Sequence, residues 1–162
     1  MLVGLVSDTH VPYRAKSMPL AAWRVLAGCD LLLHAGDVCD PQLLDEMAQL
    51  APVHAVVGNV DGPDLRAWGA GDELTLEVAG VIVSMLHDSG AAQGREQRMR
   101  KRFPGSRVVI FGHSHLPLVE QHDDLLLINP GSPTDRRRAP TFTVGLLRVE
   151  AREVNAELVH LS

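Results

Sequence analysis

The fold is decided by the stretch Leu2-Val3-Gly4-Leu5-Val6-Ser7-Asp8-Thr9-His10, an apolar run that ends in an acid and a histidine. A short apolar run with polar residues after it is typical of a strand buried on both faces. The arrangement returns at Leu31–His34, followed by Gly36-Asp37, and at Val53–Val57, followed by Gly58-Asn59. Each of these predicted strands therefore carries polar side chains just past its end.

Helices are predicted between these strands. The first covers Pro19–Ala27, with Ser17 as a candidate cap, and the second covers Pro41–Leu50, with Asp40 as its cap. A strand-helix-strand rhythm implies right-handed crossovers and parallel strands. Nearly continuous apolar strands also fit a sheet that is covered on both faces.

The second half of the chain has a different pattern. Glu73–Val78 and Val81–Leu86 alternate around Ala79-Gly80 and predict a hairpin, and Ala92–Phe103 predicts a polar, basic helix. Further strands are expected at Val108–Phe111, Leu125–Ile128, Thr141–Val149 and Val154–Leu161. We expect an α/β fold with two packed, mostly parallel or mixed sheets flanked by helices, in a single domain over residues 1–162.

Composition narrows the class of protein. Hydrophobic residues make up 46% of the 162 residues, which excludes a disordered chain, and aromatics make up only 4%, so the core must be aliphatic. The formal net charge of −5 argues against a dedicated nucleic-acid binder. Cys29 and Cys39 have no zinc-site spacing, and the N-terminus shows no signal or membrane segment, so we expect a cytoplasmic protein without a membrane partner.

The polar residues at the strand ends form a candidate metal centre. Ligands of open α/β sheets bind outside the carboxyl ends of the strands, so these residues should meet at one edge. The candidate ligands are Asp8, His10, Asp37, Asn59, His87, His113 and His115. Asp8 with His10, and His113 with His115, are two apart and would project to the same side of an extended segment. Imidazole and carboxylate together suit two divalent transition-metal ions, with Mn favoured and Fe, Zn, Ni or Co as alternatives. Asp37 is the natural carboxylate to bridge them.

The motif series resembles the calcineurin-like metallophosphoesterase superfamily. It comprises Asp8-x-His10, Gly36-Asp37, Gly58-Asn59-x-Asp61, His87 and Gly112-His113-x-His115. The chain length and Asn129-Pro130-Gly131-Ser132 resemble its small single-domain bacterial and archaeal phosphodiesterase branch.

This resemblance implies a set of roles. One metal would be held by Asp8, His10, Asp37 and His115, and the other by Asp37, Asn59, His87 and His113. Asp37, Asn59 and His113 are the catalytic candidates. A hydroxide between the ions would attack phosphorus in line with the leaving group of a small phosphoester substrate. The sequence leaves open whether the protein forms a homo-oligomer.

One departure from the family pattern concerns the leaving group. Many members have a histidine where this chain has Val60, and that histidine is thought to protonate the leaving oxygen or grip the phosphate. A general acid is worth about 10²–10⁴-fold in rate, and its loss matters most for poor leaving groups. The departure therefore favours phosphodiesters over alkyl monoesters.

Three further residues are candidates to support the ligands from behind, each with a plainer alternative. Asp61 would otherwise cap a short helix at Pro63–Trp68, Asp88 would shape its turn, and Asn129 would belong to a Pro-Gly turn. His34 is better explained as a hydrogen-bonded core histidine, and Arg136–Arg138 as a solvated loop, than as parts of the site.

Two functions compete on this sequence. The first is a metal-dependent phosphodiesterase. The alternative is a non-catalytic metal- or protein-binding scaffold, as in a eukaryotic retromer subunit with this fold that has lost much of its metal site. The complete ligand set favours the enzyme. A serine hydrolase and a P-loop NTPase are disfavoured because neither motif occurs.

Overall fold

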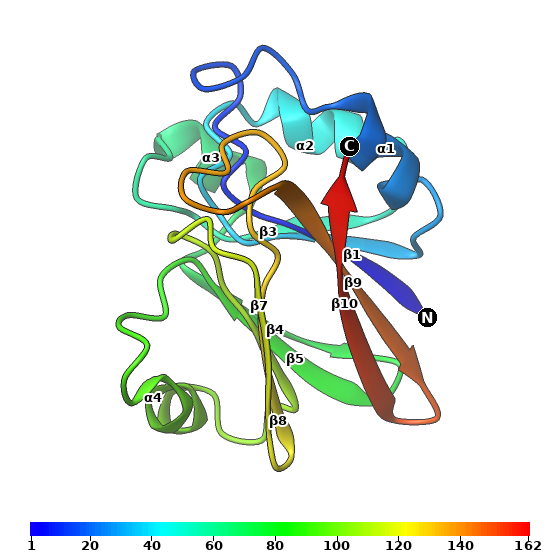
Figure 1. Cartoon of the computed structure of the whole chain (residues 1–162), viewed down its shortest axis with the longest axis vertical. Coiled ribbons are helices and arrows are strands. Elements are labelled where there is room, and N and C mark those ends of the chain that lie inside the picture. Colours follow the sequence, from blue (N-terminus) through cyan, green and yellow to red (C-terminus); the bar gives the residue numbers. More distant parts are fainter.

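Two β-sheets of five strands each lie face to face in the computed structural model, which describes residues 1–162 (Figure 1). The first sheet has the order β10-β9-β1-β2-β3, with β1 at Leu2–Val6, β2 at Leu31–His34, β3 at Val53–Ala55, β9 at Phe142–Glu150 and β10 at Glu153–Leu161. The second sheet has the order β4-β5-β6-β8-β7, with β4 at Glu73–Val78, β5 at Val81–Leu86, β6 at Val108–Ile110, β7 at Leu118–His122 and β8 at Leu125–Asn129.

Helices cover the outer faces of both sheets. Figure 1 shows α1 (Leu20–Leu26), α2 (Gln42–Met47) and α3 (Pro63–Trp68) on the side of the first sheet, and α4 (Arg95–Arg102) beside the second. The predicted architecture of two packed sheets flanked by helices is confirmed. No helix of the structure has the length and apolar character needed to cross a membrane.

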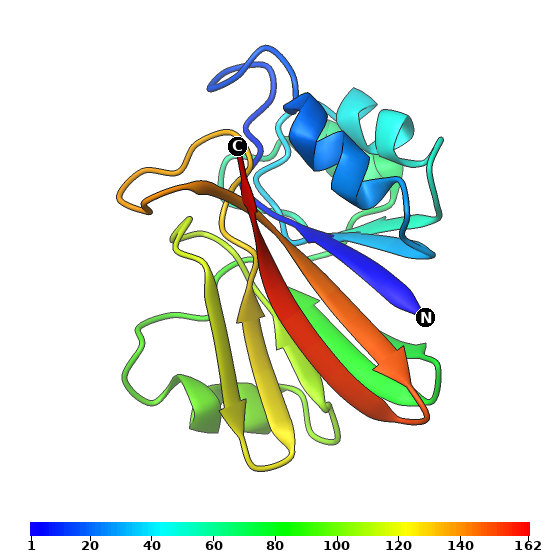
Figure 2. The same ribbon diagram turned by 45° about the vertical axis from the view of Figure 1, so that its right-hand side comes forward.

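The strand directions explain why polar side chains gather at one edge. In the first sheet β1, β2 and β3 are parallel, and the antiparallel hairpin of β9 and β10 extends the sheet beside β1. In the second sheet β5, β6 and β8 are parallel, with β4 and β7 as antiparallel edge strands (Figure 2). The strand β7 was not among the predicted ones, because its short run mixes apolar residues with glutamate, glutamine and histidine.

The main core lies between the two sheets and is aliphatic, as the composition predicts. Side chains alternate along each strand, so Leu31 and Leu33 of β2 pack into this core while Leu32 packs against the helices on the other face. A smaller cluster under α4 includes Met99 and Phe103. The strands are apolar on both faces because each face is covered.

Of the two predicted helix caps, the structure contains one. Asp40 accepts a hydrogen bond from the backbone N–H of Gln42 at 2.9 Å and so caps α2 as predicted. No side chain caps α1, so the cap proposed for Ser17 is wrong. Pro19 directly precedes α1, where its fixed φ suits the entry into a helix.

We expect the core between the sheets to dominate stability. Leu33 is 0% exposed, so Leu33→Ala should lower the free energy of unfolding by about 2–5 kcal/mol through lost burial and an unfilled cavity. Leu50, which lies after the end of α2 and is 39% exposed, provides a matched control. Leu50→Ala should change the free energy of unfolding by less than about 1 kcal/mol. Urea denaturation with chelator present measures both; equal losses would contradict this placement of the core.

Candidate metal centre

Five loops at the carboxyl ends of strands bring all seven predicted ligands together. Asp8 and His10 follow β1, Asp37 follows β2, Asn59 follows β3, His87 follows β5, and His113 and His115 follow β6. Three of these strands belong to the first sheet and two to the second, so the site lies where the two sheets meet. The metal-binding role of each residue stays a prediction, while the geometry below describes how the side chains lie.

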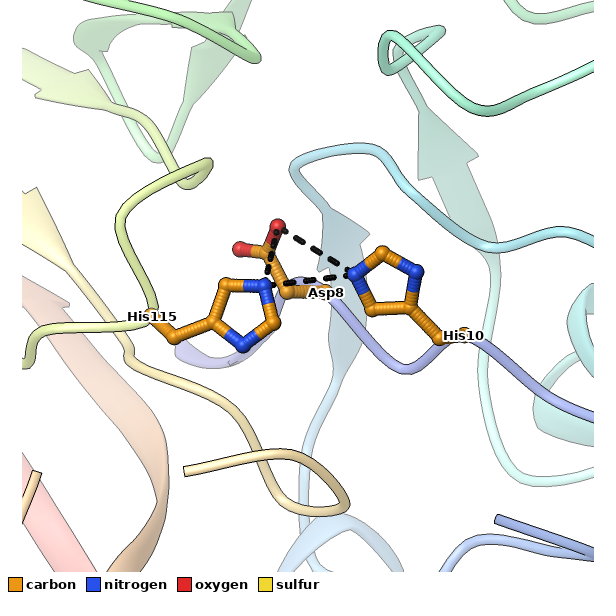
Figure 3. Close-up of side chains that lie close together, drawn as sticks. All are labelled: Asp8, His10 and His115. Carbon is orange, nitrogen blue, oxygen red and sulfur yellow. Dashed lines mark hydrogen bonds and ion pairs between the residues drawn. The ribbon is translucent and has the colours of Figure 1, made fainter. Parts of the chain in front are cut away.

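The first cluster consists of Asp8, His10 and His115, all buried (Figure 3). The Nε2 atoms of His10 and His115 are 3.2 Å apart. The Asp8 Oδ1 atom is 3.4 Å from Nε2 of His115 and 4.0 Å from Nε2 of His10. Three donor atoms therefore point at one small space, as ligands of one ion do.

The second cluster consists of Asp8, Asp37 and His87, and shares Asp8 with the first. The Oδ2 atom of Asp37 is 3.5 Å from Nε2 of His10 and 3.3 Å from Nε2 of His87. Asp37 thus lies between a histidine of each predicted metal set, which is the position that a bridging carboxylate requires. Asp8 Oδ1, 3.9 Å from Nε2 of His87, also faces both clusters.

Asn59 lies between His87 and His113. Its Oδ1 atom is 2.9 Å from Nε2 of His87 and 3.1 Å from Nδ1 of His113. Asn59 and the His113 side chain are partly open to solvent, in contrast to the buried residues of the first cluster. The site is therefore closed on the side of His10 and His115 and open on the side of Asn59 and His113.

The electrostatics of Asp8 fit a bound cation. Its Oδ1 atom is buried and has no hydrogen-bond partner. Burial raises the pKa of this carboxyl to about 7, because a buried anion loses its hydration. Nearby His87 and the hydroxyl of Ser7 act in the opposite direction but do not compensate. A divalent ion would supply the missing partner, so these residues fit the metal that their types predict.

The histidines of the buried cluster are neutral, as ligands must be. Burial lowers the pKa of His115 to about 4 and also lowers the pKa of His10. For Asp37, burial alone would raise the pKa, but the hydrogen bond and charge of His87 outweigh it and the pKa falls below its ordinary value. Asp37 is therefore an anion at neutral pH.

Backbone carbonyls fix the orientation of two ligand rings. Nδ1 of His87 donates to the carbonyl oxygen of Ala35 at 2.7 Å, and Nδ1 of His115 donates to the carbonyl oxygen of Asp135. Because a carbonyl only accepts, each Nδ1 carries a proton, and Nε2 is the ring nitrogen that faces the site. Such hydrogen bonds behind a ligand set its tautomer and basicity.

The backbone at the ligands is strained. Asp8, His10, Asp37, His113 and His115 all have positive φ, between 47° and 70°. Non-glycine residues avoid this region at a cost of about 1–3 kcal/mol each and occupy it mainly at functional sites. Asp8 and His10 were predicted to lie on the same side of an extended segment. The segment is not extended at these residues, but both side chains do reach the same cluster.

Two glycines allow the loops to approach each other closely. A Cβ at Gly58 would collide with the backbone and carboxylate of Asp37, and one at Gly112 would collide with Ser7 and Asp8. Both glycines therefore leave room for the carboxylate of the neighbouring loop.

Asp61 supports the ligand loops from behind, through their backbone rather than through a ligand side chain. Its carboxylate accepts hydrogen bonds from the backbone N–H groups of Asp37 at 2.9 Å, Cys39 at 2.7 Å and Gly58 at 2.7 Å. It does not cap α3, whose start has no side-chain cap. Asp61 therefore ties the loop of Asp37 to the loop of Asn59.

Asp88 and Asn129 shape loops rather than bonding to a buried ligand ring. Asp88 accepts a hydrogen bond from the N–H of Gly90 at 2.8 Å, and its other oxygen is 3.9 Å from Nε2 of His113. The amide of Asn129 donates to the carbonyl oxygen of Gly112 and to the hydroxyl of Ser114. Asn129 thus braces the loop that carries His113 and His115.

His34 is the core histidine that the sequence favoured, and it also touches two ligand loops. Its Nδ1 accepts a hydrogen bond from the N–H of Gly36 at 3.2 Å, and its Nε2 is 3.0 Å from the hydroxyl of Thr9. Burial lowers the pKa of His34 to about 3, so the ring is neutral. It supports the loops of Asp8 and Asp37 without entering the site.

The loop after β8 contacts the ligand loops through Ser132, Arg137 and Thr134, of which only Thr134 was not named from the sequence. The hydroxyl of Ser132 donates to the carbonyl oxygen of Asp8 at 2.8 Å, and that of Thr134 donates to the carbonyl oxygen of Thr9 at 2.6 Å. Arg137 of the same loop lies 3.4 Å from the carbonyl oxygen of His113. The sequence offered a signal for the role of this loop, since it follows a predicted strand. That strand, β8, is parallel to β6 and ends at the same edge of the sheet.

We expect Asp61 to hold the metal centre in shape. Asp61→Asn places an amide NH₂ against backbone donors, which should cost about 1–3 kcal/mol of stability and weaken Mn²⁺ binding. Asp64→Asn on the exposed start of α3 is the control and should alter neither. Calorimetric titration with Mn²⁺ and thermal unfolding measure the two effects; unchanged Mn²⁺ affinity in Asp61→Asn would refute this role.

Comparisons with known proteins agree with this geometry. The family model for the calcineurin-like phosphoesterase superfamily domain matches residues 1–152. A probable metallophosphoesterase of Methanothermobacter thermautotrophicus is 36% identical over 163 residues, covering 98% of this chain and 92% of that protein.

Solved structures with the same fold include an archaeal phosphodiesterase described as novel. It has a TM-score of 0.74 and 26% identity, and the alignment covers 98% of this chain and 100% of that one. A Vps29 single mutant of Entamoeba histolytica has a TM-score of 0.79 at 20% identity, with full coverage of both chains, and shares the fold. From the family match, the relatives and the site geometry together, the chain belongs to the calcineurin-like phosphoesterase superfamily, as its sequence motifs predicted.

Proposed function

We propose that this protein is a metal-dependent phosphodiesterase. The observation that carries the proposal is the pair of buried donor clusters that share Asp8, whose Oδ1 atom has no partner within the protein. A structural or merely solvated group of acids and histidines would satisfy that atom with a hydrogen bond. The similarity to a solved archaeal phosphodiesterase supports the same class of reaction.

Two ions fit the donor set. The first would be held by Asp8, His10, Asp37 and His115, and the second by Asp37, Asn59, His87 and His113. We propose Mn²⁺ for both, since imidazole and carboxylate ligands suit it. When bound, the ions acidify a water molecule to form the nucleophile and neutralise charge on the phosphoryl oxygens.

The remaining chemistry belongs to the chain itself. The carbonyl oxygens of Ala35 and Asp135 hold the rings of His87 and His115, so these ligands are oriented before a substrate arrives. The open side at Asn59 and His113 admits the substrate. The closed side at His10 and His115 has no comparable opening, because both residues are buried.

The rim of the open side determines which leaving groups are accepted. The side chain of Val60 is 49% exposed next to Asn59, and its backbone N–H donates to Oδ1 of Asp37 at 3.1 Å. Its isopropyl group has no proton to give to a departing oxygen. We infer that the protein acts on small phosphodiesters and on esters with acidic leaving groups, without dedicated nucleic-acid or membrane binding.

Paired aryl substrates test this function. With Mn²⁺, the protein should hydrolyse bis(p-nitrophenyl) phosphate faster than p-nitrophenyl phosphate, and chelation should abolish both activities. Asp37→Asn should lower kcat/KM by about 10²-fold or more, because it removes the carboxylate between the two ions. It should also bind less metal, as measured by elemental analysis after dialysis.

Asp64→Asn is the charge-matched control for this experiment and should retain activity and metal. A fully active Asp37→Asn protein with two metals would refute the bridging assignment. Absence of metal-dependent turnover of either substrate would favour the scaffold function in place of the enzyme.

Because Val60 cannot protonate a leaving group, a histidine at this position should change which leaving groups are accepted. Val60→His should raise turnover of a dialkyl phosphodiester, which must expel an alkoxide, relative to bis(p-nitrophenyl) phosphate, by up to about 10²-fold. Val60→Phe supplies a ring without a proton donor and should leave the ratio near that of the wild type. A ratio unchanged in Val60→His would mean that another group already supplies the proton.

A further inference from the structure

A pocket with two arginines and two aspartates in its lining adjoins the open side of the metal centre. It has a volume of about 290 Å³. Its lining joins the metal-site residues Asn59 and His87 to two arginines, Arg66 and Arg102. Arg66 comes from α3 and Arg102 from the last turn of α4, so two helices on different sheets supply the cations. Nothing in the predicted metal set accounts for these arginines.

A second pocket beside the first adds further cations, and the two together are called the basic pocket. The neighbouring pocket, of about 500 Å³, shares Asp88 and Arg102 with the first and adds Arg98 and Lys101. The two linings together hold the cations Arg66, Arg98, Lys101 and Arg102 against the carboxylates Asp72 and Asp88. This local excess of positive charge occurs on a chain whose net charge is −5. Such a concentration attracts anions.

The two arginines of the first pocket are held in place but not saturated. Arg66 donates to Asp72 at 2.6 Å, and Arg102 donates to Glu73, which begins β4. A guanidinium group has five N–H donors, so one carboxylate leaves others free. Arg66 is 54% exposed and Arg102 is 55% exposed, so their remaining donors are accessible.

Stability alone does not explain this arrangement. Exposed ion pairs contribute little to folding because solvent screens them. Arg98 of α4, by contrast, donates to the carbonyl oxygens of Ser89 and Gln93 and so holds the loop that precedes the helix. Arg66 and Arg102 make no comparable bonds to the backbone. A guanidinium that is paired with one carboxylate still has N–H donors for a second anion.

We propose that Arg66 and Arg102 bind a phosphate monoester carried on one arm of the phosphodiester substrate. The inference rests on the proposed phosphodiesterase function and names the substrate class for that same site. The scissile phosphate lies at the metal centre and the terminal phosphate lies in the basic pocket, which begins at Asn59 and His87. The preferred substrate is thus a diester that carries a second phosphate.

A matched pair of chromogenic diesters tests this specificity. Thymidine 5′-(p-nitrophenyl phosphate) and its 3′-phosphorylated form differ only in the second phosphate. With Mn²⁺, the wild type should show a kcat/KM at least about tenfold higher for the 3′-phosphorylated form, the effect of a charge-assisted hydrogen-bonded contact. In the double variant Arg66→Gln/Arg102→Gln this ratio should fall to near one.

Two controls separate anion binding from the ion pairs. Arg24→Gln removes an exposed cation of α1, remote from the pocket lining, and should keep the wild-type ratio. Asp72→Asn breaks the ion pair but leaves Arg66, so it should keep or raise the ratio. If Asp72→Asn lowers the ratio as much as Arg66→Gln does, the arginine serves only its ion pair and the inference is overturned.

The outcomes also separate this inference from the proposed function. Hydrolysis of both compounds with equal kcat/KM by the wild type overturns the basic-pocket inference and leaves the phosphodiesterase intact. Hydrolysis of neither compound overturns the proposed function, and the inference falls with it. A ratio that persists in the double variant assigns the preference to other residues and refutes the role of Arg66 and Arg102.

Discussion

The buried carboxylate of Asp8 is the constraint on which the site depends. Its Oδ2 atom accepts hydrogen bonds from the hydroxyl of Ser7 and from the backbone N–H of His113. The second bond joins the end of β1 in the first sheet to the end of β6 in the second. Its Oδ1 atom has no partner and faces the ring nitrogens of three histidines. The Asp8 side chain thus links the two sheets. It also has an unpaired, buried oxygen that a cation would neutralise.

The fold tolerates this arrangement because its stability is generated elsewhere. Five ligands have left-handed backbone conformations, and the carboxyl of Asp8 is buried with its pKa raised to about 7; both features oppose folding. The aliphatic core between the sheets and the helices packed outside them offset that cost. The strain is confined to loop residues that follow the strands, where it does not disturb the β-ladders. Such separation of scaffold and site is common in proteins that bind ligands on loops.

The backbone is as much a part of the centre as the ligands are. Carbonyl oxygens of Ala35 and Asp135 orient two rings, and Asp61 collects three N–H groups from two ligand loops. Ser132 and Thr134 hold the first ligand loop from behind. Side chains with this support are preorganised, so the proposed binding of ions would require little rearrangement. The same edge carries the basic pocket, which places anion recognition beside the reactive groups.

The sequence by itself determined the sandwich and the convergence of the seven residues, since apolar strand runs and the polar residues after them are local patterns. It also determined that position 60 lacks a proton donor. Only the tertiary structure decided that Asp61 binds the backbone of two loops, that the loop after β8 closes the back of the site, and that Arg66 and Arg102 share a pocket. The strand β7 and the left-handed ligand backbone also came only from the structure. These features arise from contacts between residues far apart in the chain, and no local period or spacing encodes such contacts.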